Sequence, residues 1–340
     1  MDVQTILDAR WQCKGCGDCC RGFSFGPVEP DIIAAIERAD IAAKWAPAAQ
    51  QPWRFTQPGP DGAPAAYLTS VDGHCIFLQD DQRCALHRLL GGDQKPWFCR
   101  EYPFYPVEDA DGRVSVAVRG DCGGLHESFE DGPLISDQVA DVLSLPRVVP
   151  RAQFNPEHVV LLPGLAISVA AWRQVEGHLL QRLTDPQSPT AAVAAARSML
   201  YTMAQRDAPA ASSTVFHQAM GAVMETLHRA APHPLLETAL QRWDGAIPTL
   251  DASAQRYVLL LMRGALLTRQ FGSVGIPAMV GLLLVETAIA AMNATAPPPL
   301  SAGDLGQGMP VLKRWIRGGE CWSQVPALRP ALEAVFAHAT

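Results

Sequence analysis

Charge is scarce in this sequence, and basic residues are outnumbered. Charged residues make up 18% of the 340 residues, below the roughly one quarter that is typical of soluble domains. The chain has 27 Lys and Arg against 34 Asp and Glu, so its net charge is −7. General nucleic-acid binding needs a basic face for the phosphates, so this composition argues against it. The acidic balance fits a basic partner instead, such as a protein substrate with exposed lysines.

Motifs that bind nucleotides or activate a serine are missing. The sequence has no P-loop, no G-x-S-x-G turn and no G-x-G-x-x-G pattern between a strand and a helix. Hydrolases of the serine type, nucleotide-driven enzymes and dinucleotide oxidoreductases are therefore poorly supported.

Signals for export and for membrane insertion are also weak. Residues 1–12 lack the basic start, the apolar stretch and the cleavage site of a secretory signal. The apolar run at 274–292 has the length of a membrane span, but it contains Pro277 and Glu286. We therefore expect a cytoplasmic protein without a membrane span, in which this run is a buried helix.

Cysteine is nearly absent after residue 122. The chain has nine cysteines, and residues 123–340 hold only Cys321. A reducing compartment disfavours disulfides, so clustered cysteines there indicate a metal. Four sulfur ligands suit zinc or an iron–sulfur cluster, and spacing alone does not choose between them. The eight clustered sulfurs allow two four-thiolate sites, or one cluster with additional cysteines.

The clustered cysteines fall into a compact motif and a dispersed set. The motif is C-x2-C-x2-C-C, at Cys13, Cys16, Cys19 and Cys20, and the dispersed set is Cys75, Cys84, Cys99 and Cys122. Two thiolates separated by two residues can bind one metal, and Gly15 and Gly17 supply the permissive backbone of such a turn. Adjacent Cys19 and Cys20 are expected to face different directions. They then serve different sites, or one is a ligand and the other supports it.

The two parts of the chain differ in regularity. Residues 1–130 are rich in Cys, Gly, Pro and aromatic residues and show weak periodicity, whereas residues 131–340 carry repeated helix-length apolar patterns. We therefore expect a mainly α protein. An irregular, metal-stapled cysteine domain with a small β-hairpin or sheet precedes an α-helical domain.

Local signals predict individual elements. Pro30 suits the first position of a helix, Asp72-Gly73 suits a hairpin turn, and the alternation within 113–119 suits a strand. A helix start is expected at Asn155-Pro156-Glu157. Further helices are expected at 165–183, 189–205, 214–229, 234–243, 252–271 and 277–292, with two short ones near 311–317 and 330–338.

The cysteine region resembles a known domain family. The C-x2-C-x2-C-C motif is followed by Cys75-Ile-Phe-Leu, Cys84-Ala-Leu-His, Cys99-Arg-Glu-Tyr-Pro-Phe and a final Cys122. This order resembles the CxxCxxCC zinc- or iron-chelating domain over residues 11–125. The resemblance implies that all eight cysteines bind metal. The domain occurs in flagellin lysine N-methylases, for which it implies a 4Fe–4S cluster, S-adenosylmethionine as methyl donor and a helical region after the domain.

Three functions are compatible with these features. The first is a cluster-dependent protein-modifying enzyme of the lysine N-methylase type, with a substrate groove between the two parts. Arg100 would then hold a carboxylate, and Glu101 or Tyr102 would handle protons. The second is a non-catalytic scaffold stapled by zinc or iron, and the third is a redox or metal-handling protein. No S-adenosylmethionine-binding strand–loop–helix motif and no C-x3-C-x2-C motif of radical enzymes is visible.

Overall fold

A four-stranded sheet connects the cysteine-rich region to the helices in the computed structural model, which describes residues 2–21, 25–154, 157–184, 188–270, 274–317 and 320–339. The strand order is β1 (Val3–Thr5), β7 (Val114–Val118), β6 (Phe104–Asp109) and β8 (Ala152–Phe154). β6 and β7 form an antiparallel hairpin, and β1 and β8 add parallel strands at its two edges. β7 is buried on both faces because helix α11 (Ala252–Leu267) packs against it.

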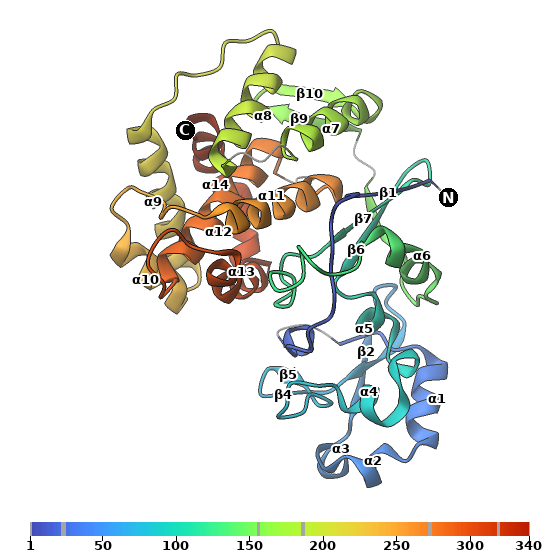
Figure 1. Cartoon of the computed structure of the whole chain (residues 1–340). Coiled ribbons are helices and arrows are strands. Elements are labelled where there is room, and N and C mark those ends of the chain that lie inside the picture. The colour runs from blue at the N-terminus through green and yellow to red at the C-terminus, as the bar shows by residue number, and fades with distance from the viewer. Residues whose placement is uncertain are drawn as a thin grey trace.

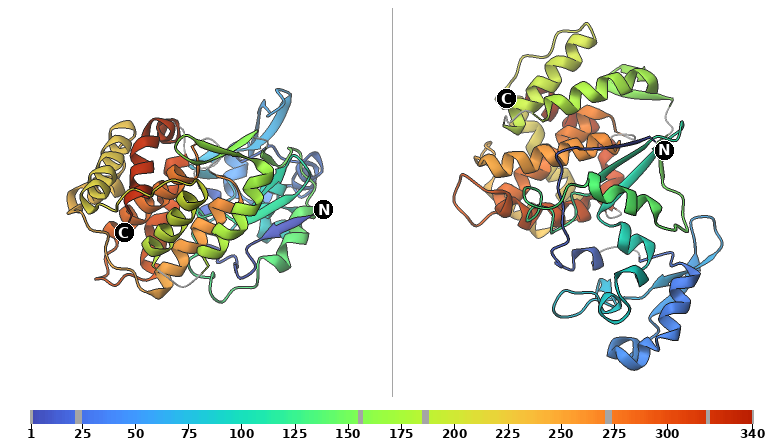
Figure 2. Two further views of the ribbon diagram at one scale, coloured as in Figure 1. Left: turned by 90° about the horizontal axis from the view of Figure 1, so that it is seen from above. Right: turned by 45° about the vertical axis from the view of Figure 1, so that its right-hand side comes forward.

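The cysteine-rich lobe has its own small core. Its helices are η1 (Asp18–Cys20), α1 (Pro30–Arg38), α2 (Ile41–Lys44), α3 (Ala46–Gln50), α4 (Ala85–Leu90), η2 (Gly92–Gln94) and α5 (Trp97–Glu101). Its strands are β2 (Arg54–Pro58), β3 (Pro64–Leu68), β4 (Ser70–Val71) and β5 (His74–Cys75). They surround Ile36, Leu68 and Phe77, which are almost fully buried. Figures 1 and 2 show this lobe in blue and cyan. The lobe is separated from the helical part of the chain, and the four-stranded sheet lies between them.

The helical part is built around one apolar helix, α12 (Ile276–Asn293). Before it come α6 (Ser136–Ser144), the hairpin of β9 (His158–Leu162) and β10 (Leu165–Ser168), α7 (Val169–Arg182), α8 (Pro189–Met203), α9 (Ser213–Ala230), α10 (Pro234–Arg242) and α11. After it come α13 (Ala302–Arg317) and α14 (Glu320–His338). α12 is long and apolar enough to cross a membrane, but 94% of its apolar window is buried, because α10, α11, α13 and α14 pack around it.

Most of the predicted elements are confirmed. The mainly α fold, the helix after Pro30, the strand at 114–118 and the helices α8 to α12 are present. The Asp72-Gly73 turn joins β4 to β5, and both of its residues have positive φ, as this type of hairpin turn requires.

Three details of the helical part were predicted wrongly. β8, β9 and β10 replace expected helix or loop, because a short apolar run does not distinguish a strand from a helix. Asn155 and Pro156 lie outside the described residues, but the chain after them enters β9 rather than a helix. α13 and α14 are longer than expected, because Pro310, Pro326 and Pro330 lie inside them and disguise the helical pattern.

The two apolar cores divide the chain at other positions than the boundary at residue 130 that the composition suggests. Ile6, Val107 and Leu125 belong to the same core as the helices, whereas residues from Cys20 to Leu86 form the separate core of the cysteine-rich lobe. The division into residues 1–130 and 131–340 stays a prediction. The structure adds that the sheet, although it comes mostly from the first part, packs with the second.

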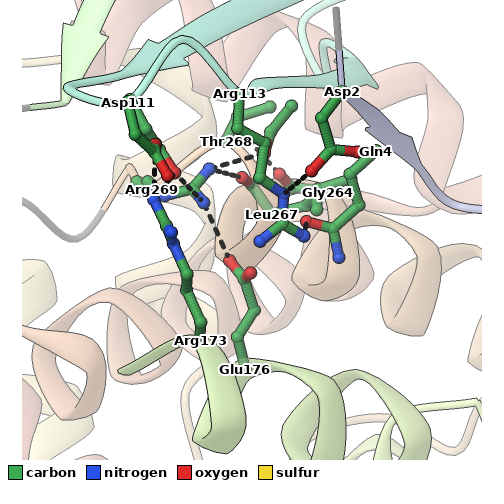
Figure 3. A network of polar contacts seen from close by, with 12 residues as sticks. Asp2, Gln4, Asp111, Arg113, Arg173, Glu176, Gly264, Leu267, Thr268 and Arg269 are labelled. Atoms are coloured by element: carbon green, nitrogen blue, oxygen red, sulfur yellow. Dashed lines mark hydrogen bonds and ion pairs between the residues drawn. The ribbon is translucent and has the colours of Figure 1, made fainter. Parts of the chain in front are cut away.

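A buried charge network fixes the sheet to the helices (Figure 3). Arg269 donates hydrogen bonds to Asp109 Oδ2 at 3.1 Å and to Ser115 Oγ at 2.6 Å, and it lies 3.6 Å from Glu176 Oε1. The side chains of Arg269, Asp109 and Glu176 are each 1% exposed. Burial raises the pKa of Glu176, and the charge of Arg269 opposes that rise. The guanidinium therefore compensates two carboxylates in a nearly water-free position.

We predict that Arg269→Met lowers the free energy of unfolding by about 3–5 kcal/mol, because it removes the ion pair of buried Glu176 and leaves Asp109 only its pair with the partly exposed Arg173. The matched control is Arg256→Gln, which breaks an exposed pair with Glu130 and should cost less than about 1 kcal/mol. Urea unfolding followed by circular dichroism measures both. Equal losses in the two variants would contradict a special role for the buried network.

Candidate metal centre

Four cysteines are brought together around the core of the cysteine-rich lobe: Cys20, Cys75, Cys84 and Cys99. An isolated bridge between Arg21 and His74 sets Cys20 beside Cys75. A second bridge pairs Leu78 with Cys84, and Leu78 N–H donates a hydrogen bond to the Cys75 carbonyl at 2.9 Å. These two contacts bring Cys84 back toward Cys75. Cys99 lies in α5. Tight turns thus gather four sequence-distant thiols.

Cys20 and Cys75 are buried, Cys84 and Cys99 are partly buried, and the thiols influence one another's charge. Burial raises the pKa of Cys75 to about 12. Burial likewise raises the pKa of Cys99, and repulsion from Cys75 and Cys84 adds to the rise. Lys95 opposes these shifts, and the charges of Cys99 and Cys84 in turn raise the pKa of Lys95, although its burial works in the opposite direction. Crowded thiols that are costly to ionise alone fit a site for a thiophilic cation, because ligation needs the thiolate form.

A second group consists of Cys13, Cys16 and Cys122. The backbone brings its segments together: Trp11 N–H donates to the Pro133 carbonyl at 3.0 Å, and Gln12 N–H donates to Ser128 Oγ at 3.1 Å. Burial, with a smaller contribution from the charges of Cys16 and Cys19, raises the pKa of Cys122 to about 12. Cys122 packs in the core of the helical part, whereas Cys20 and Cys75 pack in the core of the lobe.

Cys19 lies between the two groups. Its Sγ is 3.9 Å from Cys20 Sγ, so the expectation that adjacent Cys19 and Cys20 face different directions is wrong. The side-chain hydrogen bond with Cys20 is the main reason why the pKa of Cys19 falls to about 7. The positive φ of Gly17 and the following η1 turn both thiols toward the same side. Metals bound by these two residues would therefore be direct neighbours.

Asp18 lies over the loop that carries Cys122. A Cβ atom on Gly123 would be 1.9 Å from Asp18 Oδ2 and 3.4 Å from Cys16 Sγ, so a larger residue at position 123 would displace the Asp18 carboxylate. Asp121, which precedes Cys122, is fully buried and accepts a two-pronged ion pair from Arg119 at 3.0 and 2.6 Å. Glycine at 123 and compensated carboxylates at 18 and 121 thus allow the two cysteine loops to approach closely.

The eight described cysteines are all free thiols. Within the described ranges, no three His, Cys, Asp or Glu side chains have the spacing of a finished metal site. The donor chemistry nevertheless fits the metals that four thiolates bind, namely zinc and iron. Cys321 lies outside the side chains that the structure describes.

The predicted catalytic residues are engaged inside the protein. Arg100 Nη2 lies 3.4 Å from Glu29 Oε1, and Glu29 also accepts a hydrogen bond from Trp97 N–H at 2.7 Å. Glu101 forms an ion pair with Arg147, whose guanidinium stacks 4.4 Å from the Trp97 ring.

Tyr102 is the third of these residues. Burial raises its pKa, and the Arg119 guanidinium lies 5.6 Å from its ring. The catalytic roles of Arg100, Glu101 and Tyr102 stay a prediction.

A pocket of about 330 Å³ lies between the N-terminal segment and the helices. Asp8 and Arg10 line one side, Phe129 and Glu130 line another, and α11 contributes Arg263 among others. Arg263 Nη1 donates to Asp8 Oδ1 at 2.7 Å across it. None of the clustered cysteines lines this pocket, and neither do Arg100, Glu101 and Tyr102, so the predicted substrate groove at the metal stays a prediction.

Sequence reasoning missed several charged residues around the thiols. Lys95 is four residues before Cys99, so a search for cations beside each cysteine would have found it. Arg314 lies on α13 and reaches Asp18 and Asp121, and no local signal connects it to the cysteines.

Fold and site together define a cysteine-cluster protein of the metal-binding class, and comparison with known proteins supports this. The CxxCxxCC family model, described as "Putative zinc- or iron-chelating domain", matches residues 12–122, a segment that includes all eight clustered cysteines. Searches of the curated proteins and of the solved structures gave no match. Residues 12–122 are therefore similar to the CxxCxxCC domain, and a helical part follows them.

We predict that removal of metal with a strong chelator destabilises the cysteine-rich lobe. A metal present at about 1,000 times its dissociation constant stabilises the folded state by about 4 kcal/mol per site. Cys99→Ser should reproduce this loss, and Cys321→Ser, outside the matched segment, should not. Metal analysis combined with thermal unfolding measures both effects. Unchanged stability of chelated protein would contradict the prediction.

Proposed function

We propose that the protein chelates zinc or iron in two neighbouring four-thiolate centres that hold the cysteine-rich lobe against the helical part. The first centre uses Cys20, Cys75, Cys84 and Cys99. The second uses Cys13, Cys16, Cys19 and Cys122. The observation that carries this proposal is that eight free thiols lie in segments anchored to two apolar cores, with Cys122 in the core of the helical part and Cys20 and Cys75 in the core of the lobe.

The division of ligands follows from where each thiol is anchored. Cys20 and Cys75 belong to the core of the lobe, and Cys84 packs against that core. Cys122 belongs to the core of the helical part, and the hydrogen bonds of Trp11 and Gln12 bring the Cys13 loop to it. Cys19 packs against the core of the lobe and its charge acts on the thiols of both groups, and it is assigned to the second centre because it completes the C-x2-C-x2-C loop. Each centre then has four sulfurs.

Closed four-thiolate coordination supplies structure rather than an open position for substrate. The metal compensates thiolate charge and cross-links segments that have little secondary structure of their own. We therefore favour a metal-stapled scaffold or metal-handling protein that functions in the cytoplasm, where its thiols remain reduced.

The test is a metal count by native mass spectrometry of anaerobically prepared protein. We expect two metals in the wild type, one in Cys13→Ser and one in Cys84→Ser, with Cys321→Ser as the control that keeps both. Loss of both metals in each single variant would contradict separate centres. Acid-labile sulfide together with iron and broad absorption near 400 nm would replace this proposal with an iron–sulfur cluster of the 4Fe–4S type.

A second candidate is the protein-modifying enzyme of the lysine N-methylase type, with S-adenosylmethionine as methyl donor. The pocket beside α11 favours it, because enzyme sites are commonly concave, although its apolar lining belongs to the core of the helical part alone. Its partner would be a protein with exposed lysines, which suits the acidic net charge of −7.

We predict for this candidate that the protein transfers a labelled methyl group from S-adenosylmethionine to a lysine-rich protein. Glu101→Gln and Tyr102→Phe should lower the rate at least about tenfold, because a positioned proton acceptor contributes 10²–10⁴-fold. Metal content should be unchanged, and Arg329→Gln, which breaks a pair with Glu333 on α14 away from the pocket, is the control. No transfer by the metal-loaded wild type would exclude this activity.

A further inference from the structure

Helix α13 lies directly against the loop that carries Cys122. A Cβ atom on Gly306 would be 2.1 Å from the His126 ring, so the helix backbone touches that side chain. A Cβ atom on Gly120 would be 2.7 Å from Lys313 Cε, so the loop backbone also touches the helix. Figure 1 shows α13 at the edge of the helical part that faces the cysteine-rich region. The two surfaces meet without intervening structure.

Arg314 of α13 connects the two cysteine loops of the second centre. Its Nη1 donates a hydrogen bond to the Asp121 carbonyl oxygen at 2.8 Å and lies 3.3 Å from Asp18 Oδ2. Asp18 stands between Cys16 and Cys19, and Asp121 immediately precedes Cys122. The side chains of Arg314 and Asp18 are 13% and 23% exposed. One partly buried guanidinium therefore bridges the two segments that supply all four thiols of this centre.

The neighbouring residue fixes the position of Arg314. Lys313 forms a buried ion pair with Glu286 of α12, and both side chains are 5% exposed. Because α12 is the central helix of the helical part, this pair holds the rotation of α13 about its own axis. Arg314 is thus presented to the cysteine loops by a rigid element rather than by a flexible one.

We propose that Arg314 is a positioning residue of the centre formed by Cys13, Cys16, Cys19 and Cys122, and that it couples metal binding there to the docking of α13. The inference rests on the proposed function. By holding Asp18 and the Asp121 carbonyl together, the guanidinium orders both loops before the metal binds, which lowers the entropy cost of ligation. Its charge also compensates the net negative charge of four thiolates on a divalent metal. Coupling is reciprocal, so bound metal stabilises the docked helix to the same extent.

The experiment measures the affinity of each variant for Zn²⁺ by competition with a chromophoric chelator. Loss of an outer partner of a metal ligand typically lowers metal affinity about 10–100-fold. Arg314→Gln should therefore lower the affinity of one of the two centres for Zn²⁺ by that factor. Arg314→Lys should recover part of the loss, because it keeps the charge but not the planar fork. Arg329→Gln is the control, because it removes a comparable arginine that pairs with Glu333 on α14 at 2.7 Å.

Two further measurements separate positioning from simple stabilisation. Asp18→Asn combined with Arg314→Gln should weaken Zn²⁺ binding no more than the stronger single variant, because the two residues act through one contact. Hydrogen exchange of α13 should slow when zinc binds to the wild type, and this difference should disappear in Arg314→Gln.

The outcomes distinguish the inference from the proposal beneath it. If the wild type binds two zinc ions and Arg314→Gln binds them with the same affinities, the role of Arg314 is overturned and the two centres remain supported. Lower stability of Arg314→Gln with unchanged zinc affinity also overturns it, because the residue is then only structural. A wild type that binds no zinc and no iron overturns both.

Discussion

The rest of this structure depends on how eight crowded thiols are compensated. Burial makes the thiolate form of Cys75 and Cys122 expensive, as the rise of both pKa values to about 12 shows. A metal reverses this cost because its positive charge favours the thiolate. The segments that carry the thiols have little else to hold them, since η1 has three residues and β4 and β5 have two each. We infer that a bound metal would cross-link these segments and add to the small apolar core of the cysteine-rich lobe.

The surrounding charges are arranged to support such a centre from both sides. Lys95 faces the thiols from within the lobe, and Arg314 reaches their loops from the helical part. Arg119 compensates buried Asp121 beside Cys122. Within the sheet, Arg269 fixes β6 and β7 to α7 and to the end of α11. The Cys122 segment is therefore anchored at one end by the sheet and at the other by α13.

Much of the chemistry could be predicted from the sequence, because metal ligands are a local signal. The C-x2-C-x2-C-C motif and the residues around Cys99 identified the domain, and the apolar periods of α8 to α12 identified the helices. What could not be predicted depends on tertiary contacts. The closeness of the Cys19 and Cys20 thiols follows from the backbone at Gly17, and the contact of Arg314 with Asp18 joins residues that are distant in the chain.

X-ray absorption at the metal edge of anaerobically prepared protein tests the central claim most directly, because it counts the atoms bound to each metal. Two centres made only of cysteine predict four sulfur neighbours per metal at about 2.3 Å. Nitrogen or oxygen atoms in that first shell, or fewer than four sulfurs per metal, would contradict the account.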